Sequence, residues 1–280
     1  MVHRVVWDAY QPGRWGIHLR SANPDGTERR RTYDLDLGFT TELTLSRDGR
    51  RVAFATCCRD TLPPMVVVPV DGGTSLEPLA RHPEIDFVGG IGWSPDGTRI
   101  AFEGTSGTYP DRRNALWTIR PNGSGLRRVL GLGPLRQPFV INDALAWTRA
   151  GILYTDRRNL RSAKAGESRL VMRRVSSVRI SGDGRHIVTV RRQRGGGARA
   201  VWFGNPDGTD QRRVIAPFTP GEDPYYDVVT PNYDGTALLA SRMPAGDDGE
   251  DAVVTWETGT DPAAATEVEV ADGNYVVTWN

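Results

Sequence analysis

The charged residues most suited to chemistry stand at positions of a repeated sequence where other copies carry small residues. Aligning the copies places Asp143 and Asp227 at one position, while Glu42 and Arg179 replace residues such as glycine, alanine or threonine. Charged side chains inside a fold need polar partners. Two interpretations are open: the four residues line a ligand channel and are candidate catalytic groups, or they pair with one another or with water.

Two further carboxylates interrupt the repeat in the same way. Glu103 and Asp8 stand where other copies have alanine, threonine or valine. Such a pair could act as general acid and general base if a substrate bridged them. They belong to different repeats, so the sequence alone does not give their separation.

Arginines in the loops of three successive repeats form a second group of candidates. Asp111–Asn114 matches Asp156–Asn159, and the next repeat carries Arg191–Arg194. A guanidinium offers a two-pronged donor to carboxylate or phosphate. These loops predict an anion-binding crescent for carboxylates, phosphate or an acidic peptide tail, or else solvated loops with weak Asp–Arg pairs. The candidate binding residues are Arg112, Arg113, Arg157, Arg158 and Arg192.

The segment Phe218–Tyr226 is rich in proline and aromatic residues. This composition suits Tyr225 or Tyr226 to anchoring a binding partner, and packing of the rings over a blade is the alternative. Cys57 and Cys58 are adjacent, a spacing unsuited to an ordinary disulfide. They indicate either a redox site or a small buried apolar residue beside a free thiol.

Signatures of common catalytic and metal sites are missing from the sequence. It contains no Gly-x-Ser-x-Gly, His-Glu-x-x-His or glycine-rich phosphate loop, and its four histidines lack the spacing of metal ligands. We therefore expect no metal and no cofactor.

A repeat marked by Ser94-Pro95-Asp96-Gly97 must position these residues. Its degraded copies place the equivalents of Asp96 at intervals of 48, 54, 33 and 51 residues, in the order Asp48, Asp96, Ala150, Asp183 and Asp234. A second series of Asx-Gly turns alternates with the first, and such turns suit hairpins because glycine accepts positive φ. Each unit predicts a four-stranded antiparallel sheet of the length of a propeller blade. The short interval predicts a compressed third blade.

The two ends of the chain complement each other. Asn274–Asn280 resembles the first strand of a unit, whereas the N-terminal segments Arg4–Asp8, Gly16–Arg20 and Glu28–Tyr33 supply the other three. Their pairing closes the ring and removes exposed sheet edges. We predict an all-β, six-bladed β-propeller in one domain, 1–280. The expected blades are 37–84, 85–133, 134–175, 176–219, 220–271 and a closing blade of 1–36 with 272–280.

The run Trp93–Phe102, together with Leu126–Leu130 after the following turn, resembles the repeat of TolB-like six-bladed β-propellers, and the resemblance covers the whole chain. That family includes periplasmic TolB, which is a protein-binding scaffold, the propellers that gate prolyl oligopeptidase-type peptidases, and a few lyases. This sequence shows neither the N-terminal domain of TolB nor a hydrolase domain. The resemblance therefore implies neither the Tol-Pal partnership nor peptidase activity.

The overall charge argues against some partners. Basic and acidic residues number 35 and 34, a net charge of +1, so the chain as a whole does not attract nucleic acid or an anionic membrane. No apolar run is long enough for membrane insertion, and Met1–Asp8 lacks the features of a signal peptide. We expect a cytoplasmic monomer, or an exported one if a leader has been removed.

The function that we expect from the sequence is a non-catalytic binding scaffold. It would hold a protein or peptide partner, or a small anionic ligand, on the loop-rich face around the channel. That face carries the loops between second and third strands and between blades, and binding residues concentrate on such loops. The alternative is a small-molecule enzyme, a lyase, hydrolase or cyclase, with a polar site at the channel mouth.

Overall fold

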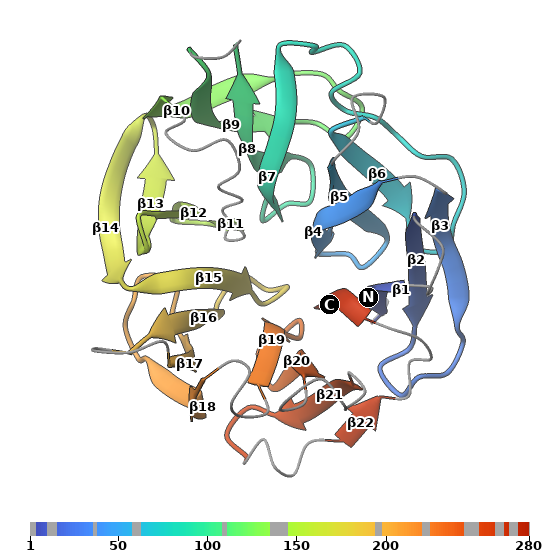
Figure 1. Cartoon of the computed structure of the whole chain (residues 1–280), viewed down its shortest axis with the longest axis vertical. Helices are drawn as coiled ribbons and strands as arrows, with labels where there is room; N and C mark the ends of the chain where they lie inside the picture. Colours follow the sequence, from blue (N-terminus) through green and yellow to red (C-terminus); the bar gives the residue numbers. More distant parts are fainter. Residues whose placement is uncertain are drawn as a thin grey trace.

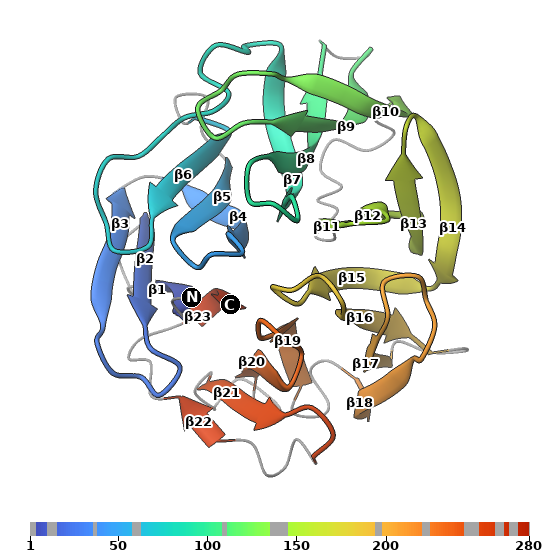
Figure 2. The same ribbon diagram turned by 180° about the vertical axis from the view of Figure 1, so that it is seen from behind.

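The computed structural model describes residues 4–9, 16–35, 38–57, 63–107, 111–134, 145–193, 198–219, 225–243, 252–260, 266–268 and 274–279. Its strands, β1 to β23, form six antiparallel sheets arranged in a ring (Figure 1 and, from behind, Figure 2). The prediction of an all-β six-bladed propeller is confirmed. Among the described residues there is no helix that could span a membrane.

Blades 1 to 5 each begin with their innermost strand and continue outward along the sequence (Figure 1). Blade 1 contains β4 (Phe39–Leu45), β5 (Arg51–Cys57) and β6 (Met65–Pro69), and blade 2 contains β7 (Ile85–Trp93), β8 (Ile100–Ser106), β9 (Arg113–Ile119) and β10 (Arg127–Pro134). Blade 3 contains β11 (Leu145–Thr148), β12 (Gly151–Asp156), β13 (Asn159–Lys164) and β14 (Glu167–Arg173). Blade 4 contains β15 (Val175–Ile180), β16 (Ile187–Arg192), β17 (Arg199–Gly204) and β18 (Arg212–Phe218), and blade 5 contains β19 (Tyr225–Pro231), β20 (Ala237–Met243), β21 (Ala252–Glu257) and β22 (Thr266–Val268).

The sixth blade joins the two ends of the chain, as predicted. It contains β1 (Val5–Ala9), β2 (Ile17–Ala22), β3 (Arg30–Leu35) and β23 (Asn274–Trp279), in the order β23-β1-β2-β3. Strand β23 pairs antiparallel with β1, and Val5 lies opposite Trp279. The C-terminal strand therefore supplies the inner edge of a sheet whose other strands come from the N-terminus.

Blade 1 departs from the expected four strands. After β6 the chain makes a single antiparallel bridge, in which Val67 and Leu76 exchange backbone hydrogen bonds of 2.9 and 2.8 Å. Pro78 follows two residues later and has no N–H to donate, so it does not extend a ladder. The fourth strand is thereby reduced to one bridge.

Blade 3 is compressed by very short connections. Arg157-Arg158 and Ala165-Gly166 form two-residue turns in which every φ is positive, at 48°, 65°, 52° and 85°. Positive φ at both central residues is the geometry of type I′ hairpins. Arg174 alone, at φ 62°, joins β14 to β15. These connections account for the short spacing between Ala150 and Asp183.

The inner turns of the blades share one hydrogen-bonded design. Oδ1 of Asp96 accepts hydrogen bonds from Ser94 Oγ at 2.5 Å and from the Thr98 backbone N–H at 3.0 Å. The hydroxyl of Ser46 donates in the same way to Asp48 Oδ1, and that of Ser181 to Asp183 Oδ1, each at 2.6 Å. The glycine after each aspartate has φ between 67° and 74°. In blades 1, 2 and 4 the aspartate thus holds the inner turn through its hydrogen bonds.

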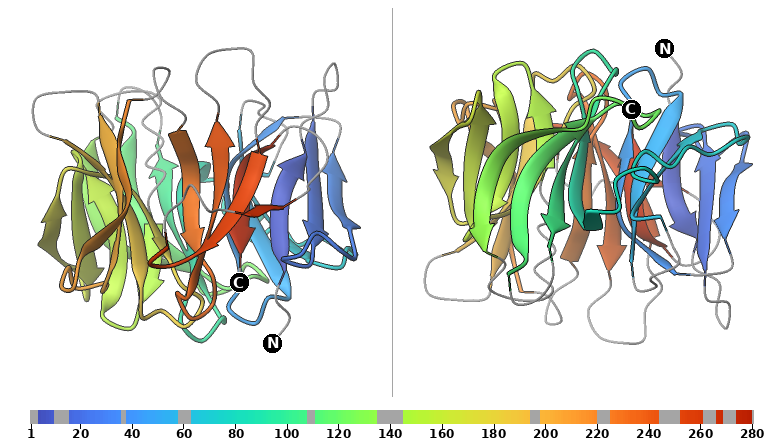
Figure 3. Two further views of the ribbon diagram at one scale, coloured as in Figure 1. Left: turned by 90° about the horizontal axis from the view of Figure 1, so that it is seen from below. Right: turned by 90° about the horizontal axis from the view of Figure 1, so that it is seen from above.

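The propeller has two distinct faces. We call the side with the turns between first and second strands of each blade the turn face, and the opposite side the loop face. Strand β1 begins and β23 ends on the turn face, as the side views show (Figure 3). Apolar residues pack between blades, for example Met65 of blade 1 with Ile91 of blade 2. The turns of separate blades are therefore held in fixed positions around the axis.

Candidate binding site at the channel mouth

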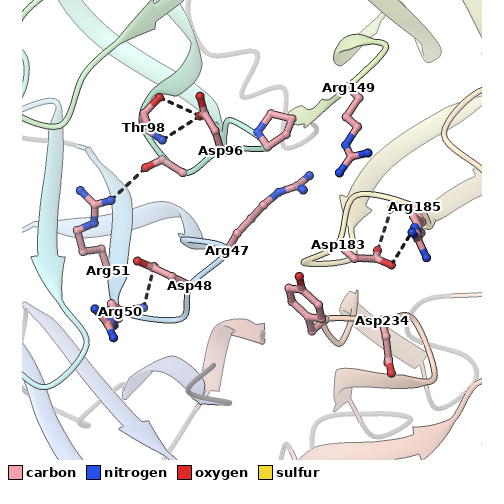
Figure 4. A pocket seen from close by; sticks show the side chains of 13 residues that line it. Arg47, Asp48, Arg50, Arg51, Asp96, Thr98, Arg149, Asp183, Arg185 and Asp234 are labelled. Atoms are coloured by element: carbon pink, nitrogen blue, oxygen red, sulfur yellow. Dashed lines mark hydrogen bonds and ion pairs between the residues drawn. The ribbon is translucent and has the colours of Figure 1, made fainter.

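The inner turns of blades 1 to 5 surround a cavity of about 1030 Å³ on the turn face (Figure 4). Guanidinium and carboxylate groups dominate its lining, with one phenol. The charged and aromatic lining residues are Arg47, Arg50, Arg51, Arg149, Arg185, Asp48, Asp96, Asp183, Asp234 and Tyr233. The volume exceeds the roughly 300 Å³ at which small-molecule pockets begin.

Three of these residues come from one position of the repeat. Arg47, Arg149 and Tyr233 each stand where the best copy has Pro95, directly before the turn aspartate or its equivalent. The turns of the five blades converge around the cavity, and all three side chains line it. Arg149 is exposed, whereas Arg47 and Tyr233 are half-buried.

Arg47 extends from blade 1 across the mouth of the channel. It lines both the mouth cavity and the narrow space below it. A side chain added at Gly184 in blade 4 would collide with the Arg47 guanidinium. Figure 4 shows this guanidinium in the centre of the cavity, with Arg149 pointing toward it and Asp183 beside it. Two guanidinium groups from different blades therefore converge at the mouth.

Burial and neighbouring charges act together on Arg47. Burial lowers its pKa, the Asp183 carboxylate opposes that shift, and the Arg149 guanidinium adds to it. An arginine remains protonated despite such shifts. The mouth consequently holds two positive charges close together, which an anion would stabilise.

Three carboxylates of the cavity accept hydrogen bonds that favour their ionised form. Hydrogen bonds from Ser94 and Thr98 lower the pKa of Asp96, and those from Thr236 lower the pKa of Asp234. Burial raises the pKa of Asp48, but hydrogen bonds from Ser46 and Arg50 outweigh it and the net shift is downward. A general acid needs a pKa near the working pH. These three carboxylates are shifted in the opposite direction.

Two of the catalytic candidates from the sequence, Glu42 and Arg179, line the narrow space below the mouth cavity. Arg179 Nη2 is 3.1 Å from Glu42 Oε1, and the two side chains are 15% and 3% exposed. The space beside them measures about 50 Å³. The alternative in which these two charges pair with each other is thus observed. Asp143 lies outside the described residues, and only the backbone of Asp227, opposite Ser241 in β20, is described.

The second carboxylate pair is divided between blades 2 and 6. Glu103 is buried and accepts a hydrogen bond from Asn114 Nδ2 at 2.8 Å. Asp8 accepts hydrogen bonds from the His18 backbone N–H at 3.0 Å and from the Thr40 hydroxyl. Each carboxylate is therefore engaged within its own surroundings, and nothing places the two around one substrate.

The predicted arginine crescent falls on the loop face of blades 2, 3 and 4. Arg112 donates to Asp86, so this arginine makes the local pair that the alternative interpretation expected. Arg157 and Arg158 form the exposed turn between β12 and β13, and Arg113 begins β9. Arg192 ends β16 and is half-buried. Anion binding by this group stays a prediction.

The proposed aromatic anchor is described only in part. The ring of Tyr226 is half-buried and lies 5.6 Å from the ring of Trp256, at an interplanar angle of 53°. This contact is the packing alternative that the composition left open. The side chains of Tyr225 and Cys57, and the whole of Cys58, lie outside the described residues.

The sequence prediction missed the residues of the mouth cavity. Their signal was present, because Arg47 and Arg149 replace the proline of the Ser-Pro-Asp-Gly turn in two copies. The sequence prediction placed the binding residues on the loops of the opposite face and did not include these turns. Within the part of the chain that the structure describes, no three His, Cys, Asp or Glu side chains gather in a way that would hold a metal ion.

Comparison with known proteins finds no matching family model and no matching curated protein. Among solved structures, TolB from Acinetobacter baumannii is similar with a TM-score of 0.69 and 14% identity, over 99% of this chain and 66% of that one. A chain of the nidogen/laminin complex gives 0.64 and 12%, over 99% and 97%. Oligogalacturonate lyase from Vibrio parahaemolyticus gives 0.56 and 13%, over 94% and 78%. The fold is that of a TolB-like propeller, and the chain spans just under two thirds of the length of Acinetobacter TolB.

Proposed function

We propose that this protein is a non-catalytic binding scaffold that holds a protein or peptide partner at the channel mouth on the turn face. The convergence of Arg47 and Arg149 over a cavity of about 1030 Å³ carries the proposal. Two guanidinium groups that converge from different blades suit recognition of an anionic group. The sequence favoured a binding site on the loop face, whereas the converging arginines lie on the turn face.

The similar structures support a scaffold at the level of the fold. They include TolB and a chain of the nidogen/laminin complex, and also an oligogalacturonate lyase, so the fold by itself selects no function. The enzyme alternative placed Asp143, Asp227, Glu42 and Arg179 around a polar site at the channel mouth. Glu42 and Arg179 contact each other beside a space of about 50 Å³, so these two residues are not open to a substrate, and Asp143 and the side chain of Asp227 lie outside the described residues.

Affinity capture from cells that produce the protein tests this proposal. Tagged wild type and the Arg47→Gln/Arg149→Ala variant are compared by quantitative mass spectrometry of the proteins that copurify. We expect the variant to lose most of a defined partner, because truncating charged groups at the centre of an interface costs about 2 kcal/mol or more. Retention of the same partner by the variant would rule out the mouth as the binding site.

Two controls accompany the capture. Arg169→Ala/Arg173→Ala removes two exposed arginines from the outer strand β14 and keeps the mouth intact, so this variant retains the partner. Arg149→Glu changes only an exposed side chain and leaves the half-buried Arg47 in place, so it tests the mouth even if the loss of Arg47 harms folding. We expect this single reversal also to reduce capture.

A further inference from the structure

A groove lies on the turn face between blades 2 and 3, outward from the channel mouth. It encloses about 840 Å³, and turns of both blades line it. The two blades are neighbours in the ring, where β10 and β14 follow one another around the rim (Figure 2). The basic residues that line the groove are Arg99, Arg127, Arg149 and Lys164.

The charge of this groove is of one sign. None of the described residues lining it carries a carboxylate. Glu167 lies opposite Lys164 in the β13–β14 ladder but is not among the lining residues. A surface with four cations attracts a ligand of opposite charge and repels one of its own. The molecule as a whole is nearly neutral, so this concentration is local.

The hydrogen bonds that hold Arg99 in place go to neutral oxygens. Its Nη2 donates to the Gly125 carbonyl at 2.6 Å and to Thr118 Oγ1 at 3.1 Å. Burial lowers its pKa, the positive charges of Arg120 and Arg127 lower it further, and the Asp96 carboxylate opposes these shifts. The neutral oxygens around Arg99 fix the direction of the guanidinium and leave its charge uncompensated by those contacts.

The floor of the groove is apolar. Leu126, Val129 and Trp147 line it and are half-buried, and Ile152 below them is buried. Val129 and Trp147 pack against the cluster that contains Ile152. A sugar-phosphate backbone would use the cations and leave this floor unused. A polypeptide can present carboxylates and apolar side chains together, and so it matches both features.

We propose that the groove binds an extended acidic segment of the partner, with its carboxylates on Arg99, Arg127 and Lys164 and its apolar side chains on Trp147 and Val129. Arg149 lines both the groove and the mouth cavity, so one segment can continue from one to the other. This inference rests on the proposed scaffold function and specifies the chemistry of the partner.

Selection from a phage-displayed library of random peptides tests the inference. The baits are the wild type, the groove variant Arg127→Glu/Lys164→Glu, the mouth variant Arg47→Gln and a control, Arg169→Glu/Arg173→Glu. The first pair and the control pair each reverse two exposed charges. We expect wild type and control to enrich peptides that combine Asp or Glu with apolar residues. A synthetic peptide from that pool should bind the groove variant about tenfold or more weakly, and added salt should weaken its binding to the wild type.

The other outcomes contradict the inference in distinguishable ways. Peptides that depend on Arg47 but bind the groove variant unchanged would overturn the groove and leave the channel-mouth scaffold standing. Enrichment of acidic residues without apolar ones, with displacement by an oligonucleotide, would indicate a general polyanion site. Absence of any enriched peptide would also overturn the groove as a peptide-binding site. The affinity capture of a native partner would then be the separate test of the scaffold function.

Discussion

At the residue scale, the turn aspartates do more than mark the repeat. Those of blades 1, 2 and 4 accept hydrogen bonds that hold an inner turn, and Arg47, the residue before the aspartate in blade 1, lines the channel mouth. The sequence exposed the aspartates readily, because they recur. Arg47 and Arg149 were harder to recognise, because they depart from the repeat at the position of Pro95, where the residue was interpreted as part of the turn.

Neutralising a turn aspartate should alter the pH dependence of stability. The pKa of Asp96 is lowered in the folded state, so its stabilising contribution is present above the unfolded pKa of about 3.9 and is lost as pH falls through the folded value. Asp96→Asn keeps an acceptor oxygen but removes the charge. We expect the free energy of unfolding at pH 7 to fall by about 1 kcal/mol, with a smaller further loss between pH 5 and 2 than in the wild type.

Urea unfolding at several pH values measures this difference. Glu167→Gln, at the exposed start of β14, controls for the removal of one negative charge from the surface. Curves for Asp96→Asn and wild type that run parallel down to pH 2 would show that the turn hydrogen bonds do not depend on ionised Asp96.

The Arg157-Arg158 turn offers a test of whether its arginines serve binding. Both residues have positive φ, which is unfavourable for residues other than glycine. Arg158→Gly should therefore raise the free energy of unfolding by roughly 0.5–1 kcal/mol, after the greater flexibility of glycine in the unfolded chain is subtracted. Arg173→Gly, in the extended strand β14, should lower it.

Thermal and urea unfolding of both variants check that expectation. If Arg158→Gly destabilises the protein, the arginine contributes packing that outweighs its backbone strain. If it stabilises the protein and weakens binding of an acidic peptide to the loop face, the predicted crescent gains support. Stabilisation without any change in binding would count against the crescent.

At the scale of elements, the closure of the ring should be the weakest point of the architecture. Strand β23 reaches β1 from the far end of the sequence, and Val5 and Trp7 of β1 are buried. Removing 272–280 exposes the edge of β1, which can then pair with another chain. We expect a lower melting temperature and self-association, measured by calorimetry and by light scattering after gel filtration.

Adding the missing strand in trans separates closure from other effects of truncation. A synthetic peptide with the sequence of 272–280 should reverse the self-association and raise the melting temperature, whereas a scrambled peptide should not. A truncated protein that self-associates no more than the wild type and melts at the wild-type temperature would show that β23 does not hold the ring closed.

At the scale of the whole molecule, the fold followed from the sequence because its rules are local and repeated. The Asp-Gly turns gave the hairpins, and the complementary ends gave the closure. The reduced fourth strand of blade 1 was missed, because it depends on where Pro78 falls rather than on the repeat. The mouth cavity was missed for a different reason, since residues from five separate turns form it only after the ring has closed.

Site-specific photo-crosslinking tests the central claim, that a partner binds at the channel mouth, most directly. A photoreactive amino acid replaces one exposed residue at a time: Thr98 beside the mouth cavity, Arg113 toward the loop face, or Leu170 on the outer strand β14. After irradiation in the producing cells, we predict that one defined protein is crosslinked at Thr98 and at neither other position. Crosslinks at Arg113 and none at Thr98 would contradict the account and return the binding site to the loop face.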